Sequence, residues 1–102
     1  MTISNLILTV RQGDADLVGE SLSGDRTAFN RIIKHYQSLI CSMAYQATGN
    51  LGQSENLAQE TFIIAWLRLG RLRKREKLGV WLCGIARGRI AHFLRREGDV
   101  QK

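Results

Sequence analysis

Residues 56–66, Asn-Leu-Ala-Gln-Glu-Thr-Phe-Ile-Ile-Ala-Trp, decide the fold class of this chain. Their apolar side chains recur with the period of an α-helix that buries one face. That face carries Leu57, Ala58, Thr61, Phe62, Ala65, Trp66 and Leu69. A second side mixes polar and apolar groups in a way that contact with water does not require: Asn56, Gln59, Glu60 and Ile63. A helix with two such faces suggests a docking element, whereas periodicity alone favours the simpler interpretation that Gln59 and Glu60 are solvated.

Helical periodicity continues on both sides of this stretch and predicts an all-α fold, a compact bundle of about four helices within residues 14–98. The state of residues 1–13 stays open between an extension of the first helix, a short strand and a partly disordered terminus. Asp14 or Asp16 is expected to cap a short first helix, which the following Ser-Gly pair ends. Residues 99–102 are expected to fray.

The second and third helices have clear boundary signals. Asp25 is expected to cap the second helix, whose large apolar residues repeat with helical spacing until Gly49 ends it. Asn50 is expected to cap the third helix, with Gln53 as its capping-box partner, and Gly70 to end it. The second helix has the strongest amphipathic pattern in the chain, which assigns its apolar stripe to the core.

A basic connector, residues 71–79, precedes a fourth helix that begins near residue 78 or 80 and ends at Gly98. Its buried residues are expected to be Leu82, Ile85, Ala86, Ile90, Phe93 and Leu94. Gly84 and Gly88 lie inside this helix, where each costs about 1 kcal/mol relative to Ala. A close approach of a neighbouring helix or of a ligand to the backbone would explain them.

The composition is that of a single globular domain: 102 residues, 44% hydrophobic and 24% charged, with no proline to interrupt helices. Cys41 and Cys83 have no CxxC partner or nearby His pair, which indicates buried free thiols in a reducing compartment. No segment approaches the ~20 apolar residues that a membrane-spanning helix needs. The apolar run Ile3–Val10 lacks the basic leader of a signal peptide, so a cytoplasmic protein without membrane insertion is expected.

The net charge of +6 is concentrated in the last third of the chain. Residues 68–96 carry ten of the fifteen basic residues against one acid, Glu76, whereas acids are in excess elsewhere. The ten are Arg68, Arg71, Arg73, Lys74, Arg75, Lys77, Arg87, Arg89, Arg95 and Arg96. This asymmetry indicates a polyanionic partner, most simply nucleic acid. A solvated basic face is the alternative.

No pattern in the sequence points to catalysis. There is no Gly-rich phosphate loop, no pair of carboxylates and no nucleophile with a base at a fixed spacing. His, Cys and acidic residues do not recur at metal-ligand spacing. We therefore expect neither an enzyme nor a cofactor or metal.

Five segments form a recognisable combination: Gly24–Phe29 (GDRTAF), Tyr36-Gln37, Leu57–Trp66 (LAQETFIIAW), Trp81–Arg87 (WLCGIAR) and Leu94–Arg96 (LRR). Together they resemble the second conserved domain of bacterial extracytoplasmic-function sigma factors, in the family's order and spacing. The match covers most of the chain, and the third and fourth segments are specific in combination. The resemblance implies an all-helical domain that docks on RNA polymerase and helps to open the promoter at its minus-ten element.

In this family, the helix that matches residues 50–69 binds the coiled coil of the polymerase clamp. Carried over by position, the resemblance implies these polymerase-binding residues: Asn56, Gln59, Glu60, Ile63 and Trp66. The same resemblance supplies a reason for the second face of the helix. The family usually has an acid where Asn56 stands, so one charged contact is expected to be weaker in this chain.

The connector and the fourth helix match the parts of the family that hold the melted non-template strand. The DNA-binding residues implied are Arg71, Arg73, Lys74, Arg75, Lys77, Arg87, Gly88, Arg89, His92, Arg95 and Arg96. Arg and Lys suit this role because they neutralise phosphates, and an aromatic ring can stack on an unpaired base. Trp81 fits either a stacking surface or the core, and its place opposite the basic face favours the core.

Three features depart from the family pattern. Gly88 stands where the family commonly has an Asn that reads an extruded base, and His92 stands where an acid is common. The connector residues Arg73-Lys74-Arg75 replace a run that contains an aromatic residue and Gly. Phosphate contacts are expected to survive these changes, whereas base-specific recognition loses its usual side chain.

The family's second domain, a C-terminal helix-turn-helix, has no counterpart in a chain of this length, which points to a fragment or a truncated reading frame. Two functions stay open. One is a transcription initiation factor that binds core RNA polymerase and single-stranded minus-ten DNA. The alternative is an interaction module of the same fold that binds polymerase or an anti-sigma factor without promoter recognition. A general helical nucleic-acid binder would leave the Gln59–Glu60 surface unexplained.

Overall fold

Four α-helices account for most of the chain. The computed structural model describes the backbone of residues 3–101 and the side chains of residues 13–98. The elements are α1 (Ile3–Leu22), α2 (Arg26–Thr48), α3 (Leu51–Arg68), the 3₁₀ turns η1 (Leu69–Arg71) and η2 (Arg75–Lys77), and α4 (Leu78–Gln101). No strand occurs in the described part of the chain, so the all-α prediction is confirmed.

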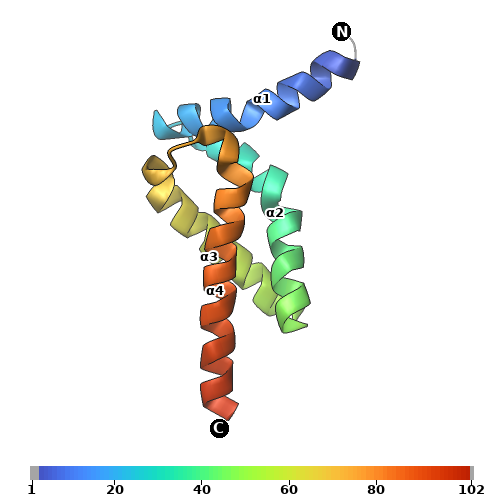
Figure 1. Cartoon of the computed structure of the whole chain (residues 1–102), viewed down its shortest axis with the longest axis vertical. Coiled ribbons are helices and arrows are strands. Elements are labelled where there is room, and N and C mark those ends of the chain that lie inside the picture. Colours follow the sequence, from blue (N-terminus) through green and yellow to red (C-terminus); the bar gives the residue numbers. More distant parts are fainter. Residues whose placement is uncertain (1–2, 102) are drawn as a thin grey trace.

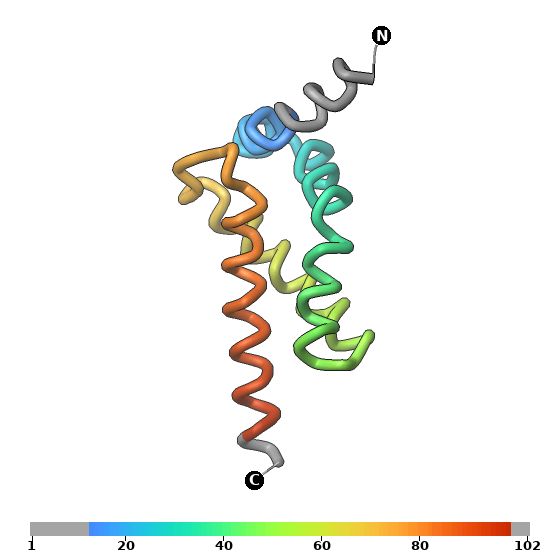
Figure 2. Tube along the Cα trace, turned by 45° about the vertical axis from the view of Figure 1, so that its right-hand side comes forward, coloured from blue at the N-terminus to red at the C-terminus, as the bar shows by residue number. Residues whose placement is uncertain are grey.

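Helices α2, α3 and α4 form the body of the bundle, and α1 lies across one end of it (Figure 1). Helix α3 packs against both α2 and α4, which places it at the centre of the fold. The connector between α3 and α4 folds back beside α1, and both of its 3₁₀ turns contact that helix (Figure 2). None of the described helices is sufficiently long and apolar to span a membrane.

The inner face of α3 is buried, as its periodicity predicts. Its buried residues are Ser54, Leu57, Ala58, Thr61, Phe62 and Ala65, and Leu69 of the following 3₁₀ turn is buried as well. Most of the apolar ones, among them Ala58, Phe62 and Ala65, lie in a core shared with Val18 of α1, Ile32 of α2 and Leu82 of α4. Leu57 lies in a second, smaller cluster with Ala44 and Ile90. Burial of each large apolar side chain contributes about 1.5–3 kcal/mol. Trp66 is the exception on this face: it is 38% exposed, and its ring meets Phe29 edge-on at a centroid distance of 4.9 Å.

The predicted start of the first helix at Asp14 or Asp16 is wrong. Helix α1 begins at Ile3, so both carboxylates lie inside it and cannot cap its N-terminus. Of the three states open for residues 1–13, the backbone of residues 3–13 adopts the helical one. Asp14 has another role, because its carboxylate accepts a hydrogen bond from the hydroxyl of Tyr36 in α2. That contact joins the first two helices.

The other predicted helix boundaries are mostly confirmed. The Asp25 carboxylate accepts hydrogen bonds from the N–H groups of residues 27 and 28, at 2.9 and 3.3 Å. Gly49 ends α2 with φ of 67°, a conformation that favours glycine. The Asn50 side chain accepts a hydrogen bond from the Gln53 N–H at 3.0 Å. The N–H of Asn50 donates to the Thr48 hydroxyl. Thr48 therefore accepts the hydrogen bond that the capping box assigns to the Gln53 side chain.

Three expectations for the last helices need correction. Helix α3 ends at Arg68, two residues before Gly70, because the chain tightens into η1 there. Helix α4 begins at Leu78 but continues to Gln101, so Gly98 does not end it and the backbone of residues 99–101 is helical. Gly98 does not adopt a positive φ, and a helical glycine costs only about 1 kcal/mol. Leu94, expected in the core, is 43% exposed.

Candidate functional site

The outer face of α3 is open to solvent. Asn56, Gln59, Glu60 and Ile63 of the predicted polymerase-binding set lie on it and are exposed, and the fifth member, Trp66, is an exposed residue of the inner face. Ile63 is 60% exposed, and Leu67, one helical turn further on, is 75% exposed. Leu67 was missed in the sequence, although its spacing of four residues from Ile63 was a usable signal. Two large aliphatic side chains beside polar groups make this face suitable for contact with another protein.

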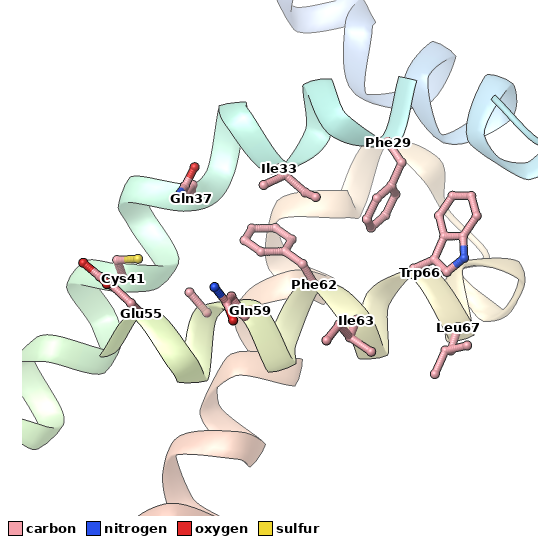
Figure 3. Close-up of a pocket in the computed structure, with 11 residues that line it drawn as sticks. Phe29, Ile33, Gln37, Cys41, Glu55, Gln59, Phe62, Ile63, Trp66 and Leu67 are labelled. Atoms are coloured by element: carbon pink, nitrogen blue, oxygen red, sulfur yellow. The ribbon is translucent and has the colours of Figure 1, made fainter. Parts of the chain in front are cut away.

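An apolar groove runs along one side of this face, between α2 and α3 (Figure 3). Its volume is about 550 Å³. Four residues of α2 at four-residue spacing form one wall: Phe29, Ile33, Gln37 and Cys41. The residues of α3 that line it are Glu55, Ala58, Gln59, Phe62, Ile63, Trp66 and Leu67. In Figure 3 the side chains of Phe29, Ile33 and Phe62 point toward one another, while Ile63 and Leu67 point away from α2. The sequence assigned the α2 stripe to the core and did not predict this groove.

The polar end of the groove contains Cys41 beside Glu55. Burial, and secondly the charge of Glu55, raise the pKa of the Cys41 thiol above its ordinary value. Both cysteines are free and half-buried, so the free thiols are confirmed, whereas their full burial is not.

A second hollow lies between α3 and α4, on the other flank of the outer face. Its lining residues are Gln53, Asn56, Leu57, Glu60, Arg89, His92, Phe93, Arg96 and Glu97. Across it, Nε of Arg89 lies 3.3 Å from Oε2 of Glu60, with the two side chains 33% and 50% exposed. The contact joins a residue of the predicted polymerase-binding set to one of the predicted DNA-binding set. The two predicted surfaces therefore adjoin at this hollow.

The predicted DNA-binding residues do not share one face. The exposed cations of the connector lie at the α1 end of the bundle: Arg71, Arg73, Lys74, Arg75 and Lys77. Along α4, Arg87 and Arg89 are two residues apart and so diverge by about 160° around the helix axis. Arg95 and Arg96 are exposed and His92 is half-buried. The structure thus brings the connector cations together but distributes those of α4 around the helix.

Arg75 makes a specific contact with α1. Its Nη1 atom lies 3.0 Å from the position that a Cβ would occupy on Gly19. The guanidinium group therefore lies directly over the α1 backbone, and a side chain at Gly19 would displace it. Arg75 is exposed, and its guanidinium group lies against α1 at Gly19.

Gly84 and Gly88 face a third hollow, of about 480 Å³, whose lining residues are Ile64, Arg68, Trp81, Gly84, Ile85, Gly88 and Arg89. A Cβ added at either glycine would meet no atom within 4 Å. Close packing of a helix within the monomer is therefore not the reason for these glycines. Trp81 is half-buried: it packs on the core and also forms a wall of this hollow, so both of its expected roles remain compatible with its position.

Comparison with known proteins shows which family this chain belongs to. Residues 32–100, more than half of the chain, match the family described as Sigma-70 region 2. The extracytoplasmic-function (ECF) RNA polymerase sigma factor SigW of Bacillus subtilis is 35% identical over 63 residues, which cover 62% of this chain and 34% of that protein. The ECF RNA polymerase sigma factor BldN of Streptomyces coelicolor is 32% identical over 80 residues, covering 76% and 30%.

A third relative is the probable RNA polymerase sigma factor RfaY of Xanthomonas campestris, 33% identical over 73 residues that cover 72% of this chain and 18% of that protein. The chain thus spans about a third or less of the length of these three relatives. The resemblance seen in the sequence motifs is confirmed, and so is the helical architecture that it implied. The chain belongs to the Sigma-70 region 2 family, as the corresponding region of ECF sigma factors.

Proposed function

We propose that this chain is a transcription initiation domain that docks on core RNA polymerase through the outer face of α3 and holds single-stranded promoter minus-ten DNA with its basic connector and α4. The observation that carries the polymerase half is the exposure of Ile63 and Leu67 next to Gln59 and Glu60. The domain has a formed core elsewhere, so folding does not account for these aliphatic groups on the surface.

Docking at this face has a clear energetic basis. Ile63 and Leu67 are 60% and 75% exposed, and complete burial of such a side chain is worth about 1.5–3 kcal/mol. Burying the exposed part of each side chain on docking would therefore contribute about 1–2 kcal/mol to binding. The adjacent groove between α2 and α3 offers further apolar surface, and the polar Gln59 and Glu60 fix the orientation of a partner.

The DNA half of the proposal is supported by charge and by access to the backbone. The connector cations are exposed and gathered at one end of the bundle, which suits the phosphates of a single strand. The hollow beside Trp81 and Gly88 has room for an unstacked base. Because Gly88 offers no side chain, its contribution to base recognition would come from shape and stacking.

The polymerase half is tested with Ile63→Asp, and the matched control is Leu39→Asp. Leu39 is 48% exposed on α2 but does not line the groove. Affinity for core polymerase is measured by fluorescence anisotropy of the labelled domain, after thermal unfolding has shown that both variants fold. We expect at least a ten-fold loss for Ile63→Asp, because burial is lost and a carboxylate must be desolvated. Equal affinities of the two variants would reject this docking face.

The DNA half is tested with single-stranded oligonucleotides that carry either a minus-ten-like sequence or its scrambled version. A preference for the minus-ten-like strand that persists across salt concentrations is expected for promoter recognition. The open space at Gly88 favours one competing function, an interaction module without promoter recognition. Equal affinity for both strands at every salt concentration would support that module instead.

A further inference from the structure

The Glu60–Arg89 contact is the only ion pair among the described residues. It connects α3 to α4 across the hollow between them, and both side chains keep part of their surface in contact with solvent. Arg89 therefore has a different environment from the connector cations, for which no ion pair is formed in the described structure. This difference separates Arg89 from the residues with which the sequence grouped it.

We propose that the guanidinium group of Arg89 belongs to the protein-docking surface and not to the phosphate-binding surface, and that the polymerase element docking there presents a carboxylate beside a cation. The inference rests on the proposed docking of polymerase at the outer face of α3. It goes further by adding a residue of α4 to that surface and by specifying the charges of the partner.

The charges at the hollow support this assignment of Arg89. A partner cation that approaches Glu60 also approaches the guanidinium group of Arg89, because the two groups are 3.3 Å apart. Attraction to one and repulsion from the other then nearly cancel. A partner with a carboxylate opposite Arg89 and a cation opposite Glu60 satisfies both groups. A partner with these two charges in the reverse order would place a carboxylate opposite Glu60 and a cation opposite Arg89, and this repulsion would disfavour its binding.

The same hollow is unfavourable for a DNA phosphate. Glu60 and Glu97 line it alongside Arg89 and Arg96, so the two carboxylates offset the two guanidinium groups and a phosphate gains no net charge attraction there. Connector cations such as Arg73 are exposed and have a single acid, Glu76, within their segment. Phosphates are therefore expected at the connector, and a protein with mixed charges at the hollow.

The test compares Arg89→Gln with Arg73→Gln in two binding assays, one with core polymerase and one with single-stranded minus-ten DNA at several salt concentrations. We expect Arg89→Gln to weaken polymerase binding about three- to ten-fold, while DNA affinity stays within two-fold and its salt dependence is unchanged. Arg73→Gln is expected to do the reverse, with the slope of log affinity against log salt reduced by about 0.7.

A charge exchange separates docking from simple stabilisation of the fold. The double variant Glu60→Arg with Arg89→Glu retains an internal ion pair and the net charge. If the partner contacts both charges in their native positions, the double variant should bind polymerase at least ten-fold more weakly than the wild-type domain. If the pair only holds α3 to α4, the double variant should bind like the wild type, which would overturn the proposal. Thermal unfolding of each variant verifies that it folds.

Two further results would also overturn the proposal: a loss of DNA affinity for Arg89→Gln like that of Arg73→Gln, or tighter polymerase binding by Arg89→Gln. The first would assign Arg89 to DNA, and the second would mean that it only shields Glu60. Failure of the proposed function is recognised separately, because Ile63→Asp would then leave polymerase binding unchanged as well.

Discussion

Gly79→Ala is expected to destabilise the domain, whereas the same substitution at Gly84 or Gly88 is expected to stabilise it. All three glycines lie in α4, where alanine is intrinsically favoured by up to about 1 kcal/mol. The difference comes from their surroundings. A Cβ on Gly79 would lie 3.2 Å from both Cε1 and the hydroxyl oxygen of Tyr36, while a Cβ at the other two positions would meet nothing within 4 Å.

The cost at Gly79 depends on whether Tyr36 can move away. Its hydroxyl is held by the hydrogen bond to Asp14, and its ring packs against the core, so the ring cannot shift without losing a contact. Overpacking of this kind costs about 1–3 kcal/mol. Set against a gain of at most about 1 kcal/mol, Gly79→Ala should lower the free energy of unfolding by about 1 kcal/mol. Gly84→Ala should raise it by about 1 kcal/mol.

Urea and thermal unfolding followed by circular dichroism measure these differences. In a domain of this size, 1 kcal/mol corresponds to a shift of about 4–8 °C in Tm, so the two variants should differ by roughly twice that amount. Combining Gly79→Ala with Tyr36→Phe tests the cause, because loss of the hydroxyl frees the ring from Asp14. The double variant should then be less destabilised than the sum of the single variants. Stabilisation by Gly79→Ala, equal to that by Gly84→Ala, would refute the reasoning.

Three other expectations follow from single side chains. Asp25→Ala should lower stability by about 1 kcal/mol through loss of the α2 cap, while Asp16→Ala, at an exposed position inside α1, should change it by less than about 0.5 kcal/mol; thermal unfolding measures both. Burial raises the pKa of Tyr36 above its ordinary value of 10.0, so the folded state disfavours ionisation of its hydroxyl. The stability of the wild-type domain should therefore fall above about pH 10. A pH series of urea unfolding should show a smaller loss in Tyr36→Phe. The raised pKa of the Cys41 thiol should slow its alkylation by iodoacetamide at pH 8 relative to a free cysteine, and Glu55→Gln should speed it; peptide mass spectrometry distinguishes the two cysteines, and an unchanged rate in Glu55→Gln would contradict the effect of that charge.

Helices and their caps were predictable because the forces that set them act over a few residues. The apolar period of α3 assigned Leu57, Phe62 and Ala65 to the core, and all three are buried. Asp25 and Gly49 were recognised as helix boundaries because their capping interactions involve only neighbouring backbone groups. The family motifs likewise identified the segment that places residues on the outer face of α3.

Local signals failed where a distant partner replaced the local one. Asp14 has the sequence appearance of an N-cap, but its carboxylate accepts a hydrogen bond from Tyr36 in another helix. Leu94 continues the apolar period of α4 but is 43% exposed. Periodicity alone does not say whether another helix covers a given position.

The sequence by itself determined the all-helical fold, the buried face of α3, the caps and the family, because periodicity, capping and motif spacing are all properties of short segments. Only the tertiary structure decided how the surfaces of those helices combine. It places Glu60 beside Arg89, 29 residues apart in sequence, and forms the groove from α2 and α3 together. The physical reason is that ion pairs, grooves and shared surfaces depend on how helices cross, and crossing is fixed by packing of the whole core.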